Sequence, residues 1–193
     1  MRQFNDKLLR LLIDGGVDFV IVGGIAAIAH GALRTTLDLD VVAAFNHENM
    51  GRLLAALHEV HPRNAARPDL GEIEATAEEL ARYRNLYLVT DVGELDVLGE
   101  LPPIGGYAEA AETAVRFELF GKECAVLGLD QLIAIKEHLG RAKDLEALRE
   151  LRAIRERLRG VRSGAAVGAG REFAVGEVEA ADHDGAVVAG ADE

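Results

Sequence analysis

Apolar residues in the first third of the chain switch repeatedly between helical spacing and short aliphatic runs. Leucines at helical spacing predict a helix over residues 3–14 that ends at a glycine pair, and a β-branched run predicts a buried strand over 19–22. A short helix over 25–30 and a strand over 37–43, in which acidic and aliphatic residues alternate, follow. An amphipathic helix is predicted over 47–60. We expect the two strands to be neighbours in one sheet.

The rest of the pattern continues the mixture of strands and helices. A segment with two prolines, residues 61–75, is predicted as a loop that borders a site. Four strand-like runs follow at 86–89, 94–98, 115–119 and 124–127, the last two forming a hairpin, and helical spacing returns at 129–139 and 142–158. Six predicted strands interleaved with helices indicate an α/β fold.

The composition changes near residue 160. Residues 160–193 hold seven Gly and nine Ala, lack Leu and Ile, and carry two basic against seven acidic residues. Such a segment buries too little apolar surface to fold, so a disordered acidic tail is predicted there. The whole chain has 193 residues, 49% of them apolar, which is enough for one sizeable core. We therefore expect one domain over residues 1–159.

Charge and cysteine content narrow the class of protein. The net charge of −12, of which residues 1–159 carry −7, argues against a surface made for nucleic acid or for an anionic membrane. The single cysteine, Cys124, excludes an internal disulfide. The chain start has no signal-peptide pattern, and no apolar run approaches the roughly 20 residues of a membrane-spanning helix. A soluble cytoplasmic protein without a membrane partner is expected.

Three acidic residues lie within aliphatic strand-like runs. Asp38 and Asp40 are two residues apart, so both side chains point to the same face of their predicted strand. Asp96 lies in a second run and can face them from a neighbouring strand. Carboxylates gathered in this way repel one another, and Mg²⁺ prefers such oxygen ligands. The sequence therefore predicts a divalent metal site.

A glycine pair, Gly23-Gly24, joins the first predicted strand to the following helix. A backbone without side chains, with free N–H groups at a helix start, lets a phosphate group approach closely. Taken alone, the pair is also a common turn device.

The order Gly23-Gly24, thirteen residues, then Asp38-Leu39-Asp40-Val41 resembles the signature of the DNA polymerase β-like nucleotidyltransferase superfamily. The segment Arg34-Thr35-Thr36 before the strand, with Lys136 and Arg141-Ala142-Lys143-Asp144 after the hairpin, resembles the minimal, toxin-type branch that includes abortive-infection nucleotidyltransferases. The likeness covers roughly residues 15–150. It implies a palm-like mixed sheet flanked by helices.

The resemblance also implies roles for individual residues. Asp38, Asp40 and Asp96 would hold two Mg²⁺ ions, with Asp96 as the general base near the acceptor hydroxyl. The NTP-binding set implied by the likeness is Gly23, Gly24, Arg34, Thr35, Lys136, Arg141 and Lys143. Without the likeness, the basic residues of this set are equally well explained as a solvated helix surface with intrahelical ion pairs.

The implied activity is transfer of NMP from an NTP to an acceptor hydroxyl with release of pyrophosphate. The implied acceptors are the 3′ end of tRNA or a hydroxyl of a partner protein, with a cognate antitoxin restraining the enzyme. Two alternatives stay open: a module that binds a nucleotide or a partner protein without turnover, and an aminoglycoside-type small-molecule nucleotidyltransferase.

A basic stripe on the last predicted helix allows two interpretations. Arg152, Arg155, Arg159 and Arg162 fall on one side of the helix and can contact RNA phosphates. They can equally form a solvated surface with neighbouring glutamates, and the absence of interleaved aromatic residues favours this second interpretation.

Overall fold

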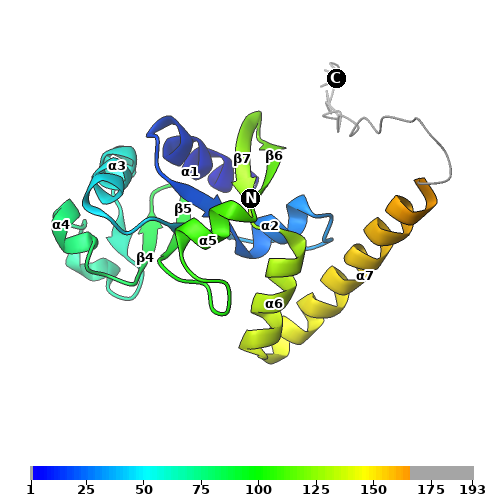
Figure 1. Ribbon diagram of the computed structural model, residues 1–193. Coiled ribbons are helices and arrows are strands. Elements are labelled where there is room, and N and C mark those ends of the chain that lie inside the picture. The colour runs from blue at the N-terminus through cyan, green and yellow to red at the C-terminus, as the bar shows by residue number, and fades with distance from the viewer. Residues whose placement is uncertain (1, 166–193) are drawn as a thin grey trace, which may run out of the picture.

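The computed structural model describes residues 2–165, in which helices and strands alternate (Figure 1). In chain order the elements are α1 (Arg2–Asp14), β1 (Phe19–Ile21), α2 (Gly23–Ala29), β2 (Asp38–Ala43), α3 (His47–Leu57), a 3₁₀ turn (His58–Val60), β3 (Arg63–Asn64), a second 3₁₀ turn (Pro68–Leu70), α4 (Ala77–Leu80), β4 (Asn85–Thr90), β5 (Gly93–Leu98), α5 (Tyr107–Glu112), β6 (Val115–Leu119), β7 (Lys122–Val126), α6 (Leu129–Leu139) and α7 (Ala142–Ala165). The six predicted strands are all present.

The strands form one seven-stranded sheet in the order β3-β4-β5-β2-β1-β7-β6. β2 is parallel to β5 and β1 is parallel to β7, whereas the other neighbouring pairs are antiparallel. The predicted mixed sheet flanked by helices is therefore confirmed, as is the pairing of the first two strands. The seventh strand, β3, lies within the segment 61–75 that was predicted as a loop.

Alternation along the central strands buries one face of the sheet. Leu39 and Val41 of β2, and Leu95 and Val97 of β5, are at most 1% exposed. Helix α1 contacts both strands, and α3 packs against α1. Because neighbouring residues of a strand point to opposite faces, the acidic residues between these aliphatic ones lie on the other side of the sheet.

The end of α1 is set by a glycine in the left-handed conformation. Gly16 has a φ of 64°, and the N–H of Val17 donates to the carbonyl of Leu12 at 3.0 Å. This pattern is the usual glycine stop of a helix. The turn it creates leads directly into β1 and confirms the predicted end of the helix.

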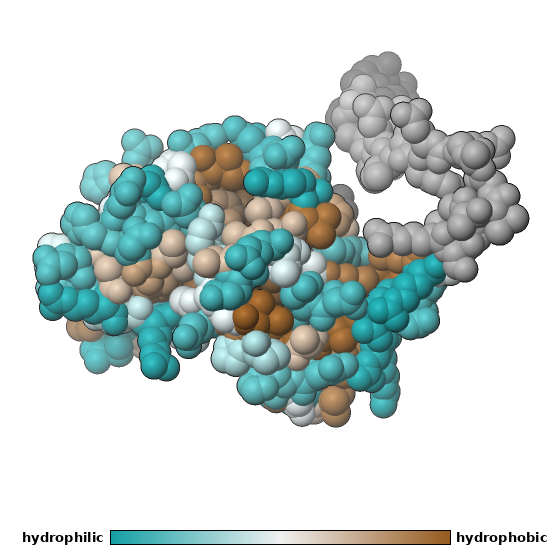
Figure 2. Space-filling view, viewed as in Figure 1, coloured by the Kyte–Doolittle hydropathy of each residue, from teal (hydrophilic) through white to brown (hydrophobic). Residues whose placement is uncertain are grey.

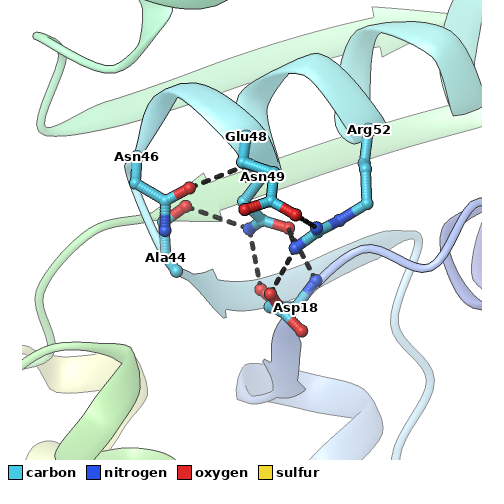
Figure 3. A network of polar contacts seen from close by, with 6 residues as sticks. All are labelled: Asp18, Ala44, Asn46, Glu48, Asn49 and Arg52. Atoms are coloured by element: carbon cyan, nitrogen blue, oxygen red, sulfur yellow. Dashed lines mark hydrogen bonds and ion pairs between the residues drawn. The ribbon is translucent and has the colours of Figure 1, made fainter.

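A polar network fastens one end of β2 to β1 and α3 (Figure 3). The Nδ2 group of Asn49, which is fully buried, donates to the carbonyl oxygens of Asp18 and Ala44 at 3.0 and 2.9 Å. Its Oδ1 accepts from the N–H of Asp18 at 2.7 Å, and Arg52 pairs with the Asp18 carboxylate. The network holds the C-terminal end of β2 in place and thereby fixes the register of the strand.

The second face of the sheet is covered unevenly. Helix α2 packs on β2, and α5 packs on β1 and β2. Val20 and Val42, which lie on this side of the two strands, are fully buried. Asn85 and Tyr87 of β4, by contrast, are exposed. This second face carries Asp38, Asp40 and Asp96, and we call it the acidic face. It is covered by helices at β1 and open to solvent at β4.

Helices α6 and α7 pack against each other and are joined at Gly140, whose φ is 59°. Figure 2 shows a hydrophilic outer side on α7 and apolar side chains around α2 and α6. Helix α7 continues to Ala165, past its predicted end at residue 158. The predicted tail begins within this helix, and residues 166–193 lie outside the described part. None of the described helices combines the length and apolarity that crossing a bilayer requires.

Two short helices, α4 and α5, were not predicted. They have four and six residues, which is too short for a helical period to show. A capping signal was nevertheless present before α4, because Thr76 and Glu79 have the spacing of a capping box and form it.

Candidate functional site

The register of the central strands brings the three predicted acidic residues together. Asp40 pairs directly with Asp96 across β2 and β5, and Asp38 lies two residues before Asp40 on the same side of β2. One carboxylate oxygen from each residue lies within 4.8 Å of the other two. All three side chains are half-buried. Carboxylate oxygens in this arrangement fit a divalent cation such as Mg²⁺.

Gly23 is packed against Asp40. A Cβ at Gly23 would lie 1.9 Å from Oδ2 of Asp40, and Gly23 has a φ of 60°. Both the space and the backbone conformation exclude other residues. The N–H of the preceding Val22 donates to the carbonyl of Asp40 at 2.9 Å. The first glycine of the pair thus allows the start of α2 to lie directly on the strand that carries Asp38 and Asp40.

Thr36 holds the first acidic residue in place, a role that was not predicted from the sequence. Its hydroxyl donates to Oδ1 of Asp38 at 2.5 Å. A Cβ at Gly24 would lie 2.5 Å from this same hydroxyl oxygen, so the second glycine makes room for Thr36. A threonine two residues before an Asp-x-Asp strand was the available signal.

Burial and like charges raise the pKa of Asp96 to about 6. Desolvation is the largest cause, followed by the negative charges of Asp40, Asp38 and the neighbouring Glu94. A cation among the three carboxylates would remove the repulsive part of this shift. The perturbed pKa is typical of carboxylates grouped for metal binding or proton transfer.

Two predicted phosphate-binding cations gather around a buried carboxylate at the α6–α7 turn. Asp144 is 1% exposed and accepts from Lys136 Nζ at 2.9 Å and from Arg141 Nε at 2.5 Å. The hydrogen bond from Arg141 is the largest cause that lowers the pKa of Asp144 to about 2. The Arg141 side chain stays 52% exposed. Asp144 therefore orients two cations, one of which is open to a solvent-borne anion.

The other predicted nucleotide-binding residues are placed as follows. Arg34 pairs with Glu150 of α7 at 3.2 Å, and the N–H of Leu33 donates to the same carboxylate at 2.6 Å. Thr35, next to Arg34, is exposed. The side chain of Lys143 lies outside the described part of the structure. Glu150 thus ties the loop before β2 to α7, a contact that was not predicted from the sequence.

Three arginines of the α7 stripe form ion pairs with α6, and the side chain of the fourth, Arg162, lies outside the described part of the structure. Arg152 contacts Glu137 at 2.7 Å, and Arg155 contacts Asp130 at 3.3 Å. Arg159 lies 3.9 Å from the same aspartate. These contacts support the interpretation of the stripe as a paired helix surface and give it a structural task, namely holding α7 on α6.

Comparison with known proteins finds distant similarity only. No family model matches the sequence, and no curated protein matches it. Among solved structures, a nucleotidyltransferase candidate from Thermotoga maritima is similar at 18% identity and a TM-score of 0.48, over 74% of this chain and 86% of that chain. The antibiotic-resistance factor ANT(2'')-Ia is similar at 16% identity and a TM-score of 0.48, over 83% of this chain and 92% of that chain.

Proposed function

We propose that this chain is an enzyme, a Mg²⁺-dependent nucleotidyltransferase that moves NMP from an NTP to an acceptor hydroxyl. The observation that carries the proposal is the convergence of Asp38, Asp40 and Asp96 within 4.8 Å on one face of the sheet. The glycine pair packed against this group, in the order typical of the polymerase β-like superfamily, supports it further.

The reaction joins the acceptor oxygen to the α-phosphorus, breaks the bond from that phosphorus to the bridging oxygen and releases pyrophosphate. Two Mg²⁺ ions held by the three carboxylates would stabilise charge on the attacking and leaving oxygens. Asp96 takes the hydroxyl proton in this proposal. Desolvation, the largest cause of its raised pKa and one that a bound cation does not cancel by charge, would keep this carboxylate more basic than a solvated aspartate.

The triphosphate is proposed to lie beside the backbone of Gly23 and Gly24, next to the Asp40 carboxylate that packs against the first glycine. Cations further along the chain would bind its outer phosphates: Arg34, Lys136, Arg141 and Lys143, with the Thr35 hydroxyl beside them. The exposed half of Arg141, held in place by Asp144, supports this assignment. Phosphate binding by Arg34 would have to share or replace its contact with Glu150.

We propose a toxin-like role with an RNA acceptor, the 3′ end of tRNA, or with a hydroxyl of a partner protein, and a cognate antitoxin as the restraining partner. One observation favours a second candidate, a cationic small molecule as in aminoglycoside nucleotidylation. Glu94 is exposed and pairs with Asp38 across the β2–β5 ladder, which adds a fourth carboxylate beside the site. Such a surface attracts cationic acceptors.

The proposal is tested by incubating the purified protein with Mg²⁺ and each NTP labelled at the α-phosphate, with and without total tRNA. One gel separates labelled RNA from labelled protein. The Asp38→Ala, Asp40→Ala double variant should lose all label, because it lacks two of the three metal ligands. Transfer retained by this variant would overturn the proposal.

A further inference from the structure

The open side of the acidic face carries an aromatic residue next to the proposed general base. Tyr87 of β4 pairs directly with Asp96 of β5, and Asp96 pairs directly with Asp40 of β2. Residues paired in this way point to the same face of a sheet, with strands about 4.8 Å apart. Tyr87, Asp96 and Asp40 therefore form a row across three strands.

The ring of Tyr87 is exposed and yet held in position. Its relative exposure is 48%, whereas Val20 and Val42 at the opposite end of the same face are fully buried beneath the helices. The Nδ2 group of Asn85 donates to the Tyr87 phenol oxygen at 3.4 Å. The Oδ1 atom of Asn85 accepts in turn from the N–H of Gly99 at 3.2 Å. The amide thus links the ring to the end of β5.

The direction of approach to Asp96 follows from this arrangement. Helices α2 and α5 pack over β1 and β2, so an acceptor reaches Asp96 more freely across β5 and β4. An acceptor that arrives by this route meets the Tyr87 ring before its hydroxyl reaches the acid. An exposed aromatic face binds nucleobases by stacking, and the adjacent amide of Asn85 offers polar atoms to a base edge.

We infer that Tyr87 is an acceptor-binding residue, on which the terminal nucleobase of an RNA acceptor stacks so that its ribose hydroxyl lies beside Asp96. The inference rests on the proposed function and names the part of the site that receives the acceptor. A protein hydroxyl on Ser or Thr would bring no ring to this position. The triphosphate side of the site, around Gly23 and Gly24, lies across β2 from Tyr87.

The test uses five proteins: wild type, Tyr87→Ala, Tyr87→Phe, Asn85→Ala and Tyr83→Ala. Tyr83 is a matched exposed tyrosine at 56%, but it follows α4, which packs against α3 on the other layer. Thermal unfolding of each variant first shows that it is folded. Mg²⁺ and each NTP are then added, and the thermal shift reports nucleotide binding apart from acceptor binding.

Acceptor binding is measured in two ways: as KM for total tRNA in transfer, and as the affinity for a fluorescently labelled single-stranded RNA ending in CCA. Tyr87→Ala should weaken both by about tenfold or more, the size of a lost base stack, and leave the NTP-induced shift unchanged. Tyr87→Phe should stay within about threefold of wild type, and Tyr83→Ala should equal it. Asn85→Ala should weaken binding in the same direction by a smaller factor.

Several outcomes would overturn the inference. One is unchanged RNA affinity in Tyr87→Ala, and another is an equal loss of NTP binding, which would make Tyr87 a general structural element of the site. A wild-type protein that does not bind the RNA also contradicts it. Failure of the proposed function alone has a different signature, namely Tyr87-dependent RNA binding without any labelled product.

Discussion

At the scale of single residues, the site depends on small residues that allow the acids to pack. Gly23 and Gly24 lie where a Cβ would meet Asp40 and Thr36 at 1.9 and 2.5 Å. Thr36 in turn fixes Asp38 through a hydrogen bond of 2.5 Å. The glycine pair is therefore part of the architecture that holds the carboxylates, in addition to its proposed place beside the phosphates.

Gly23→Ala should lower stability and Mg²⁺ affinity together. The new methyl group displaces Asp40, and a non-glycine residue at a φ of 60° adds strain of about 1–2 kcal/mol. Calorimetric Mg²⁺ titration and urea unfolding measure the two effects. The matched control is Gly140→Ala, which has a φ of 59° and no atom closer than 3.9 Å to the added Cβ. Gly140→Ala should show the strain without the loss of Mg²⁺ binding. Equal Mg²⁺ affinities for Gly23→Ala and Gly140→Ala would contradict this account.

Asp96→Asn should stabilise the metal-free protein while abolishing transfer. The folded chain raises the pKa of Asp96 from 3.8 to about 6, so ionised Asp96 disfavours the folded state. The free energy of unfolding should therefore fall as pH rises from about 4 through 6, and the Asp96→Asn variant should lack this fall.

The stability test is a thermal melt at pH 8 without metal. We expect Asp96→Asn to melt a few degrees above wild type, at about 2–4 °C per kcal/mol for a chain of this size. The order should reverse with saturating Mg²⁺, which stabilises only the chain that binds it. Glu94→Gln, at an exposed neighbouring acid, is the control and should change little. A metal-free melting temperature of Asp96→Asn below that of wild type would contradict the assigned repulsion.

The residues of the site were predictable to different degrees. Asp38 and Asp40 stand out in the sequence because they interrupt an aliphatic strand at a spacing of two. Their approach to Asp96 depends on the parallel pairing of β2 with β5, which strand periodicity alone does not specify. Thr36 was missed because a single hydrogen bond to the next acid leaves no periodic pattern.

At the scale of elements, two devices position the site: the β2–β5 ladder and the turn between α6 and α7. Six strands were predictable because short apolar runs mark them, as in β1 between Asp18 and Gly23, whereas the two-residue strand β3 was not predicted. The helices α4 and α5 were not, because they span about one turn each. The cations of the α6–α7 turn were predicted to be solvated surface residues or phosphate-binding residues, whereas in the structure Lys136 and Arg141 contact a buried Asp144.

Asp144→Ala should loosen this turn and destabilise the chain. Removing a carboxylate that is 1% exposed leaves Lys136 and Arg141 without their partner. We expect a loss of about 2 kcal/mol, below the range for fully buried pairs because both cations reach water. Urea unfolding measures it.

The control for this prediction is Asp130→Ala, which removes an exposed carboxylate that also contacts two arginines. It should cost about 1 kcal/mol or less. The sign of the pH dependence provides a second check. The pKa of Asp144 is lowered to about 2, so its contribution is complete above pH 4 and is lost as pH falls towards 2. Equal costs for the two variants at pH 7 would contradict the role of Asp144.

At the scale of the whole molecule, helices cover one face of the mixed sheet and leave part of the other face open to solvent. Helices α1 and α3 cover the apolar face, and α2 and α5 close half of the acidic face. The chain carries a net charge of −12, so a polyanionic substrate must be attracted locally, by bound cations and by residues such as Arg141. The charge count predicted this requirement, but the location of the open side came only from the structure.

The most direct test of the central claim compares NTP labelled at the α-phosphate with the same NTP labelled at the γ-phosphate, in the presence of Mg²⁺ and total tRNA. Nucleotidyl transfer predicts that α-label enters the acceptor, that γ-label leaves as pyrophosphate, and that the Asp38→Ala, Asp40→Ala variant does neither. Label entering the acceptor from the γ-phosphate, or α-label transferred equally well by the double variant, would contradict the account.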